Sequence, residues 1–163
     1  MVEKLIEAGF DEDITVNTVN SIMGMRFSED EKYATLDLNR IDLYNGNAIF
    51  VKIGAAPSFI KRGRDVISIN SKNLPFGLVD EVDVEVIREV LRPGDILINV
   101  SDGILDIDKS NSGESTWIED YLKTINSDPR ELSEKVLERA KKLSNGTIKD
   151  DMTVVVSKVY LDS

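Results

Sequence analysis

The sequence predicts an α+β fold, and three observations support this class. Short apolar runs in period-two alternation, separated by turn residues, dominate residues 33–100. Two stretches with helical periodicity follow, at residues 116–125 and 129–143, and one apolar run closes the chain. Strands followed by helices and a last strand are typical of antiparallel sheets covered by helices. We expect residues 1–163 to be a single domain with a sizeable core.

Two helices are expected before the first strand. Residues 2–8 have the pattern of a helix that ends at Gly9, a residue suited to the left-handed conformation found after helices. A second helix is predicted over residues 13–27, and acidic residues at its start suit the helix dipole. Its predicted buried face comprises Ile14, Val19, Ile22 and Met23.

Turn residues divide the strand-rich region. Asn45-Gly46 predicts a two-residue hairpin turn before the strand at residues 48–53. A second hairpin is predicted around the basic cluster Lys61-Arg62-Gly63-Arg64. We interpret that cluster as a solvated hairpin tip, with a phosphoprotein docking patch as the alternative. Residues 82–91 are predicted as a strand, although residues 85–91 could also be helical.

Local signals also delimit the elements of the C-terminal half. A buried strand is predicted at residues 96–100, and another begins at residue 154. Asp128-Pro129 predicts a helix start, because Asp is a good N-cap and Pro is favoured at the first helical position.

Composition excludes many kinds of catalytic site. The chain has no His and no Cys, so Ser-His-Asp, Cys-His and the usual zinc sites cannot be built from it. Carboxylates that bind Mg²⁺ or Mn²⁺ remain available. The net charge of −10 argues against a nucleic-acid partner, since phosphate binding needs clustered Lys and Arg.

Composition also bears on location. Zero cysteines fit a reducing cytoplasm. No apolar run approaches the roughly 20 residues of a membrane helix, and the N-terminus lacks the pattern of a signal peptide. We therefore expect a cytoplasmic domain, whose parent protein could carry membrane anchors in segments absent here.

Two acidic motifs occupy strand ends. Asp102-Gly103 follows the strand at residues 96–100, and Asp150-Asp151 opens the last strand. Taken singly, each motif is more often a helix N-cap or a turn than a metal ligand. The Asp150-Asp151 pair is more informative, because adjacent acids repel each other unless a cation is bound. The sequence alone does not show that the two strands are neighbours.

Two further acids follow Asp102. Asp106 and Asp108 do not complete an EF-hand, since Gly is not at the sixth position and no Glu stands at the twelfth. We interpret both as surface acids.

Around these motifs the sequence resembles the PPM-type, protein phosphatase 2C-like, metal-dependent serine/threonine phosphatases. The resemblance rests on Val100-Ser101-Asp102-Gly103 and Asp150-Asp151-Met152-Thr153. Residues 33–38, 54–63 and 74–77 add further segments in the family's order, so that the match covers nearly the whole chain. Within the family, these segments are most similar to the phosphatase domains of sporulation regulators.

The resemblance implies a fold, a reaction and site residues. The implied fold is an α-β-β-α sandwich of two antiparallel sheets flanked by helices. Its site holds two Mn²⁺ or Mg²⁺ ions, and a metal-bound water hydrolyses phosphoserine or phosphothreonine. Asp102 and Asp150 match metal-binding aspartates of the family, and therefore residues that act through the metal-bound water. We assign Gly103 and Asp151 supporting roles in the second shell, since Asp151 stands where the family often has Asn.

One family motif is missing. These enzymes carry an earlier Asp-Gly whose aspartate bridges both ions, and no such pair precedes the first predicted helix of this chain. We therefore expect an N-terminally truncated phosphatase domain that lacks its first strands and is inactive or nearly so, although its parent is an enzyme.

The resemblance also implies a partner, and alternatives stay open. The implied substrate is a phosphorylated anti-anti-sigma factor in sporulation control. One alternative is a phosphatase-like module that binds a partner without catalysis, and another is a carboxylate-metal hydrolase acting on a small phosphate ester. Exposed apolar residues of the two N-terminal helices predict a homodimer.

Overall fold

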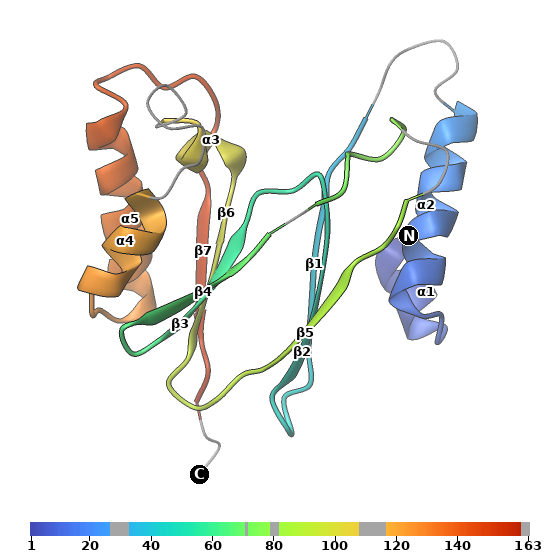
Figure 1. The fold of residues 1–163 in the computed structure, drawn as a ribbon, viewed down its shortest axis with the longest axis horizontal. Helices are drawn as coiled ribbons and strands as arrows, with labels where there is room; N and C mark the ends of the chain where they lie inside the picture. Colours follow the sequence, from blue (N-terminus) through green and yellow to red (C-terminus); the bar gives the residue numbers. More distant parts are fainter. Residues whose placement is uncertain (27–32, 71, 79–81, 108–116, 161–163) are drawn as a thin grey trace. The chain divides into compact units, whose positions relative to one another are not determined.

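The computed structural model describes residues 1–26, 33–70, 72–78, 82–107 and 117–160 (Figure 1). The chain forms two compact units, which are described one at a time. Unit 1 is Met1–Ala55 with Ser71–Val90, and unit 2 is Ala56–Asn70 with Leu91–Ser163. Each unit contains one antiparallel sheet and helices beside it, which confirms the predicted fold class. Among the described helices, none is long and apolar enough to cross a membrane.

The described residues of unit 1 form a three-stranded sheet in the order β1-β2-β5 and two helices. The elements are α1 (Val2–Glu7), α2 (Glu12–Arg26), β1 (Leu36–Ile41), β2 (Asn47–Ile53) and β5 (Val86–Val90). The strand predicted within residues 82–91 is confirmed, with narrower bounds, and the helical alternative is wrong. Gly9, with φ of 89°, follows α1 as predicted.

The core of unit 1 lies between α2 and the sheet. Val16 and Val19 of α2 pack with Val51 and Ile53 of β2. The predicted helix is confirmed, but its predicted buried face is partly wrong, because Ile14 is 49% exposed. Polar residues of α2 are buried instead, as the Discussion describes.

The first hairpin connects β1 to β2, and its predicted two-residue turn is wrong. Residues 42–46 form a longer loop, in which the main-chain N–H of Gly46 donates to the carbonyl of Asp42 (2.8 Å). The carboxylate of Asp42 accepts from the main-chain N–H of Tyr44 and from the Asn45 side chain. Gly46 has a φ of 74°, so the glycine is required for the turn, but side-chain bonds from Asp42 favour the wider loop.

In the part of unit 2 that the structure describes, the chain forms a four-stranded sheet in the order β4-β3-β6-β7 and three helices. The elements are β3 (Ser58–Arg62), β4 (Asp65–Ile69), β6 (Ile96–Val100), α3 (Asp102–Leu105), α4 (Trp117–Thr124), α5 (Pro129–Leu143) and β7 (Val154–Lys158). The predicted bounds of α5 are confirmed, and the Asp128 side chain caps it by accepting from the N–H of Glu131 (3.0 Å). The core includes Ile98 of β6, Leu122 of α4 and Leu132 of α5.

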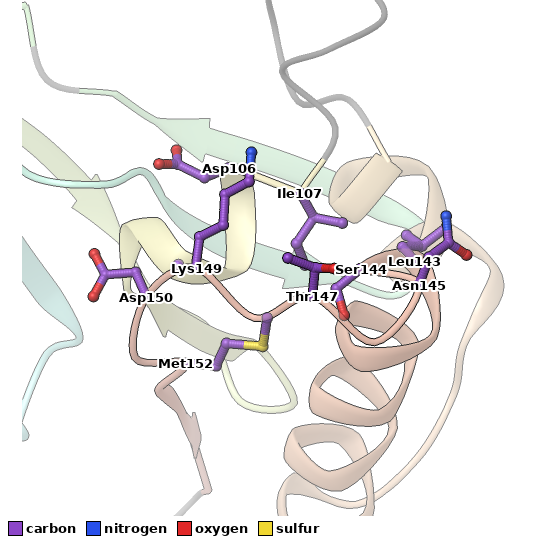
Figure 2. A pocket seen from close by; sticks show the side chains of 10 residues that line it. Asp106, Ile107, Leu143, Ser144, Asn145, Thr147, Lys149, Asp150 and Met152 are labelled. Carbon is purple, nitrogen blue, oxygen red and sulfur yellow. The ribbon is translucent and has the colours of Figure 1, made fainter.

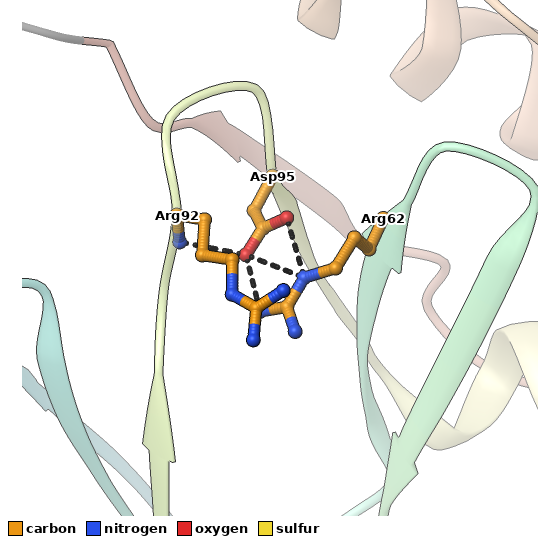
Figure 3. Close-up of polar contacts among 3 residues, drawn as sticks. All are labelled: Arg62, Arg92 and Asp95. Carbon is orange, nitrogen blue, oxygen red and sulfur yellow. Dashed lines mark hydrogen bonds and ion pairs between the residues drawn. The ribbon is translucent and has the colours of Figure 1, made fainter.

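The second hairpin is confirmed, but its basic cluster is not simply solvated. Lys61 is 3% exposed, and its ammonium donates to the carbonyl of Gly63. The Arg62 guanidinium makes a bidentate ion pair with the buried Asp95, which lies in the turn before β6 (Figure 3). Asp95 also accepts from the main-chain N–H of Arg92 (2.8 Å). Of the four residues in the cluster, two therefore serve the structure of unit 2 rather than a docking surface.

Candidate metal centre

Strand pairing in unit 2 brings the two acidic motifs together. β6 and β7 are antiparallel neighbours, and Val100 pairs with Val154. Asp102 therefore leaves β6 at the edge of the sheet where the segment after Asp150 enters β7. The sequence could not show this neighbourhood, because it depends on pairing between segments about 50 residues apart.

Gly103 is the point of closest approach between the motifs. A Cβ atom added there would lie 2.4 Å from the carbonyl oxygen of Asp151 and 3.1 Å from that of Asp150. Real Cβ atoms do not come so close to backbone atoms, so this position requires glycine for space rather than for a special φ. Replacing Gly103 by any other residue would push the two acidic segments apart.

Ser101 ties the same segments with three hydrogen bonds. Its hydroxyl donates to the carbonyl of Asp151 (2.9 Å) and accepts from the N–H of Thr153 (2.9 Å). Its main-chain N–H donates to the carbonyl of Thr153 (3.0 Å). No role for Ser101 was predicted from the sequence. Its place between a buried strand and an acid was a weak signal, since Ser is common in turns.

The two carboxylates lie on the surface of unit 2. Asp102 is the first residue of α3, and its carboxylate accepts from the N–H of Gly103 (3.0 Å). The carboxylate of Asp150 accepts from the N–H of Asp151 (2.7 Å). Both acids are exposed, so each keeps oxygen atoms that a cation could bind. Asp106 is exposed, as predicted, and Asp108 lies outside the described residues.

The donor set suits a hard divalent cation, although it is small. Mg²⁺ binds one or two protein carboxylates and keeps several waters, so the motif pair fits this ion in donor chemistry. Among the residues that the structure describes, no group of three or more acids, His or Cys lies close enough to hold a metal ion. The described residues therefore offer part of a ligand set.

A pocket of about 170 Å³ adjoins the acidic motifs (Figure 2). Gly103 and Asp150 line it, together with the end of α3, the turn after α5 and the segment that leads into β7. In Figure 2 the side chains of Asp106, Lys149 and Asp150 lie on one side of the view, and the turn after α5 lies on the other. This pocket was not predictable from the sequence, because its walls come from three separate segments.

Solved structures with the same architecture define the class of the fold. The PP2C phosphatase domain of SpoIIE from Bacillus subtilis, solved with a fragment of the regulatory domain, aligns with a TM-score of 0.84 and 42% identity, covering 98% of this chain and 48% of that chain. A manganese-presoaked structure of the SpoIIE phosphatase domain from Bacillus subtilis aligns with a TM-score of 0.77 and 39% identity. The alignment covers 99% of this chain and 73% of that chain. The two sheets with flanking helices are thus those of a PP2C-type phosphatase domain, as the sequence predicted.

Sequence comparison identifies the family. A family model described as stage II sporulation protein E (SpoIIE) matches residues 1–160. The stage II sporulation protein E of Bacillus subtilis (strain 168) is 42% identical over 160 residues, which are 98% of this chain and 19% of that protein. The Priestia megaterium protein is 38% identical and is matched over 27% of its length. The chain belongs to the stage II sporulation protein E family, and it spans less than a third of the length of these relatives.

Proposed function

We propose that the protein containing this chain is a metal-dependent protein serine phosphatase. The observation that carries the proposal is the close approach of Asp102-Gly103 to Asp150-Asp151. It brings two exposed carboxylates to one edge of the unit 2 sheet, in a chain of the SpoIIE family. The absence of His and Cys agrees with hydrolysis that needs no side-chain nucleophile of those types.

In this proposal Asp102 and Asp150 bind Mn²⁺ or Mg²⁺, two ions in the complete site. When bound, such ions supply an activated water and neutralise charge on the phosphoryl oxygens. Gly103 and the main chain of Asp151 keep the two ligand segments in contact. Ser101 holds the same segments together by hydrogen bonds, so it positions both ligands without contacting substrate.

The 163 residues by themselves are proposed to have little or no activity. Asp102-Gly103 is their single Asp-Gly pair, so a bridging aspartate in a second such pair is not available from this sequence. Two carboxylates leave much of the charge of two divalent ions uncompensated, which lowers affinity.

The substrate is proposed to be a phosphorylated anti-anti-sigma factor in sporulation control, as membership of a sporulation family suggests. We also propose a homodimer through α1 and α2, because Phe10, which lies between the two helices, and Ile14 of α2 are 47% and 49% exposed. Both proposals concern the protein that contains this chain, and a cytoplasmic location of this domain is a prediction from its composition.

The test is manganese-dependent phosphate release from a phosphoserine protein, using the longest natural chain that contains these residues. We expect Asp102→Asn and Asp150→Asn each to lower kcat/KM by about a hundredfold or more, since each removes a metal ligand. Asp120→Asn is the matched control, because Asp120 is an exposed acid of α4. Calorimetric Mn²⁺ titration gives a second readout, in which the two site variants should bind the ion more weakly.

The alternative is a phosphatase-like module that binds a partner without catalysis. The observation that favours it is the absence of a three-acid group among the described residues. Phosphate release at equal rates from the wild type, Asp102→Asn and Asp150→Asn proteins would contradict the assignment of Asp102 and Asp150 as metal ligands. No release from the wild type at saturating Mn²⁺ would favour the module.

A further inference from the structure

The pocket beside the acidic motifs has the size of a subsite for one side chain. Its volume of about 170 Å³ lies below the roughly 300–1,000 Å³ typical of small-molecule sites. A nucleotide would not fit inside it, whereas an aliphatic side chain would. Because Gly103 and Asp150 line the pocket, it is continuous with the proposed metal centre (Figure 2).

The walls of the pocket combine apolar side chains with two carboxylates, Asp106 and Asp150, and one cation. Ile107, Leu143 and Met152 supply apolar surface. Ile107 and Met152 also pack against the core of unit 2. Their attachment to the core keeps these walls in place when a ligand enters. Among the described residues that line the pocket, Lys149 is the single basic one.

A turn with left-handed backbone conformation forms the pocket wall that comprises Ser144, Asn145 and Thr147. Asn145 and Gly146, directly after α5, have φ of 50° and 81°. Asn145 is the one non-glycine residue with positive φ in the part of the chain that the structure describes. The N–H of Thr147 then donates to the carbonyl of Ser144 (2.9 Å) and closes the turn. This reversal sends the chain from α5 back toward Gly103, so that the pocket lies between the two.

We propose that this pocket recognises the substrate polypeptide, by taking one apolar side chain next to the phosphoserine while Lys149 attracts the phosphate. The identity of the ligand rests on the proposed function. Neighbouring Cα atoms are about 3.8 Å apart. A side chain beside a phosphoserine whose phosphate lies at Lys149 is therefore within reach of the pocket, which Lys149 lines. A chain with net charge −10 and exposed acids repels a phosphate dianion, and Lys149 offsets that repulsion locally.

The test measures binding rather than turnover. The ¹⁵N-labelled chain, without metal, is titrated by NMR with a five-residue peptide that has phosphoserine between two leucines. We expect saturable shifts of the amides of Ile107, Thr147, Lys149 and Met152. A peptide with alanines in place of the leucines should bind about tenfold more weakly, because it leaves the apolar walls uncovered.

Two variants and a matched control sharpen the result. Thr147→Trp, at an exposed position of the rim, fills the pocket and should weaken binding about tenfold. Lys149→Met should weaken it about two- to fivefold, with the difference shrinking at high salt. Lys142→Met removes an exposed cation of α5 that does not line the pocket and should leave the Kd unchanged. Circular dichroism checks that each variant is folded.

The outcomes separate this inference from the proposed function. Absence of binding by the wild type, shifts away from the pocket, or equal Kd for the wild type and Thr147→Trp would each overturn the inference. Peptide binding at the pocket together with no phosphate release by the longer protein would overturn the phosphatase and leave the pocket as a phosphopeptide subsite. Equal Kd for the leucine and alanine peptides would contradict the apolar role of the walls.

Discussion

The helices α2 and α5 each have 15 residues, but they are attached to their sheets in different ways. The buried side chains of α5 are Leu132, Val136 and Ala140, which form an apolar stripe at intervals of four residues. The buried face of α2 includes Val16 and Val19, and it also includes Glu12, Thr15 and Asn20. One helix is therefore held mainly by apolar contact, and the other also needs polar partners.

The polar partners of α2 come from its own unit. Glu12 makes an ion pair with Arg40 of β1 (2.5 Å). The side-chain oxygens of Asn17 and Asn20 accept from the main-chain N–H groups of Val82 (3.3 Å) and Gly77 (3.1 Å). Such contacts add little net stability when intact, but losing one partner leaves a buried polar group unpaired. The comparison teaches that a helix can be placed accurately by its polar contacts while gaining less stability from burial.

The largest loss of stability is expected from truncating a buried leucine of α5, and the matched change is an isoleucine of α2. Leu132→Ala should lower the free energy of unfolding by about 2–5 kcal/mol, because Leu132 is fully buried and a cavity would remain. Ile14→Ala in α2 should change it by less than about 0.5 kcal/mol, because Ile14 is 49% exposed. Urea denaturation measures both values. Equal losses in the two variants would contradict the described faces of the helices.

A smaller effect is expected from the polar attachment of α2. Asn20→Ala should lower the free energy of unfolding by about 1–3 kcal/mol, because Asn20 is buried and the N–H of Gly77 loses its acceptor. Thr18→Ala is the control, since the Thr18 hydroxyl donates within the helix to the carbonyl of Ile14 (2.7 Å). A loss in Thr18→Ala as large as that in Asn20→Ala would mean that helix propensity, not docking, explains the result.

Hydrogen exchange tests the same difference without mutation. We expect the central amides of α2 to exchange about tenfold faster than those of α5, because less apolar surface holds α2 in place. Mass spectrometry of peptides from the two helices, after correction for intrinsic rates, measures this ratio. Slower exchange in α2 than in α5 would show that its polar contacts stabilise it more than expected.

The smallest expected effects are on the pH dependence of stability. One buried ion pair, of Arg62 with Asp95, should affect it in acid, and the other, of Lys52 with Asp37, in alkali. Burial opposes the charge of Asp95, but bonds from Arg62 and Arg92 and their charges outweigh it and lower its pKa. The unfolded chain then binds more protons, so this contribution is present above about pH 3.9 and is lost as the pH falls. Burial lowers the pKa of Lys52 despite its bond to Asp37, so stability should rise with pH up to about 10.4.

Denaturation at several pH values checks these slopes. Arg62→Met should reduce the acid-side loss, because the Asp95 pKa is no longer held low by its guanidinium. Lys52→Met should remove the alkaline rise, because the group that titrates is gone. Unchanged slopes in the two variants would mean that other groups control the pH dependence.

Features that depend on a few neighbouring residues were predictable from the sequence. The bounds of α5 follow from Asp128, Pro129 and the apolar repeat, all of which act within a few residues. The strand at residues 96–100 and the glycine turn after α1 were predictable for the same reason. The two acidic motifs could be predicted to form one site only because both match motifs of the same phosphatase family.

Contacts between segments that are distant in the sequence were not predictable, because they depend on the tertiary structure. The contact of Gly103 with Asp150 and Asp151 exists because β6 pairs with β7, and no local pattern specifies that pairing. The burial of Lys61 and the pairing of Arg62 with Asp95 overturned the prediction of a solvated tip in the same way. The prediction that Ile14 is buried was wrong for a related reason. Hydrophobicity predicts the buried face of a helix only when apolar contacts determine its orientation, and polar residues also contribute to the buried face of α2.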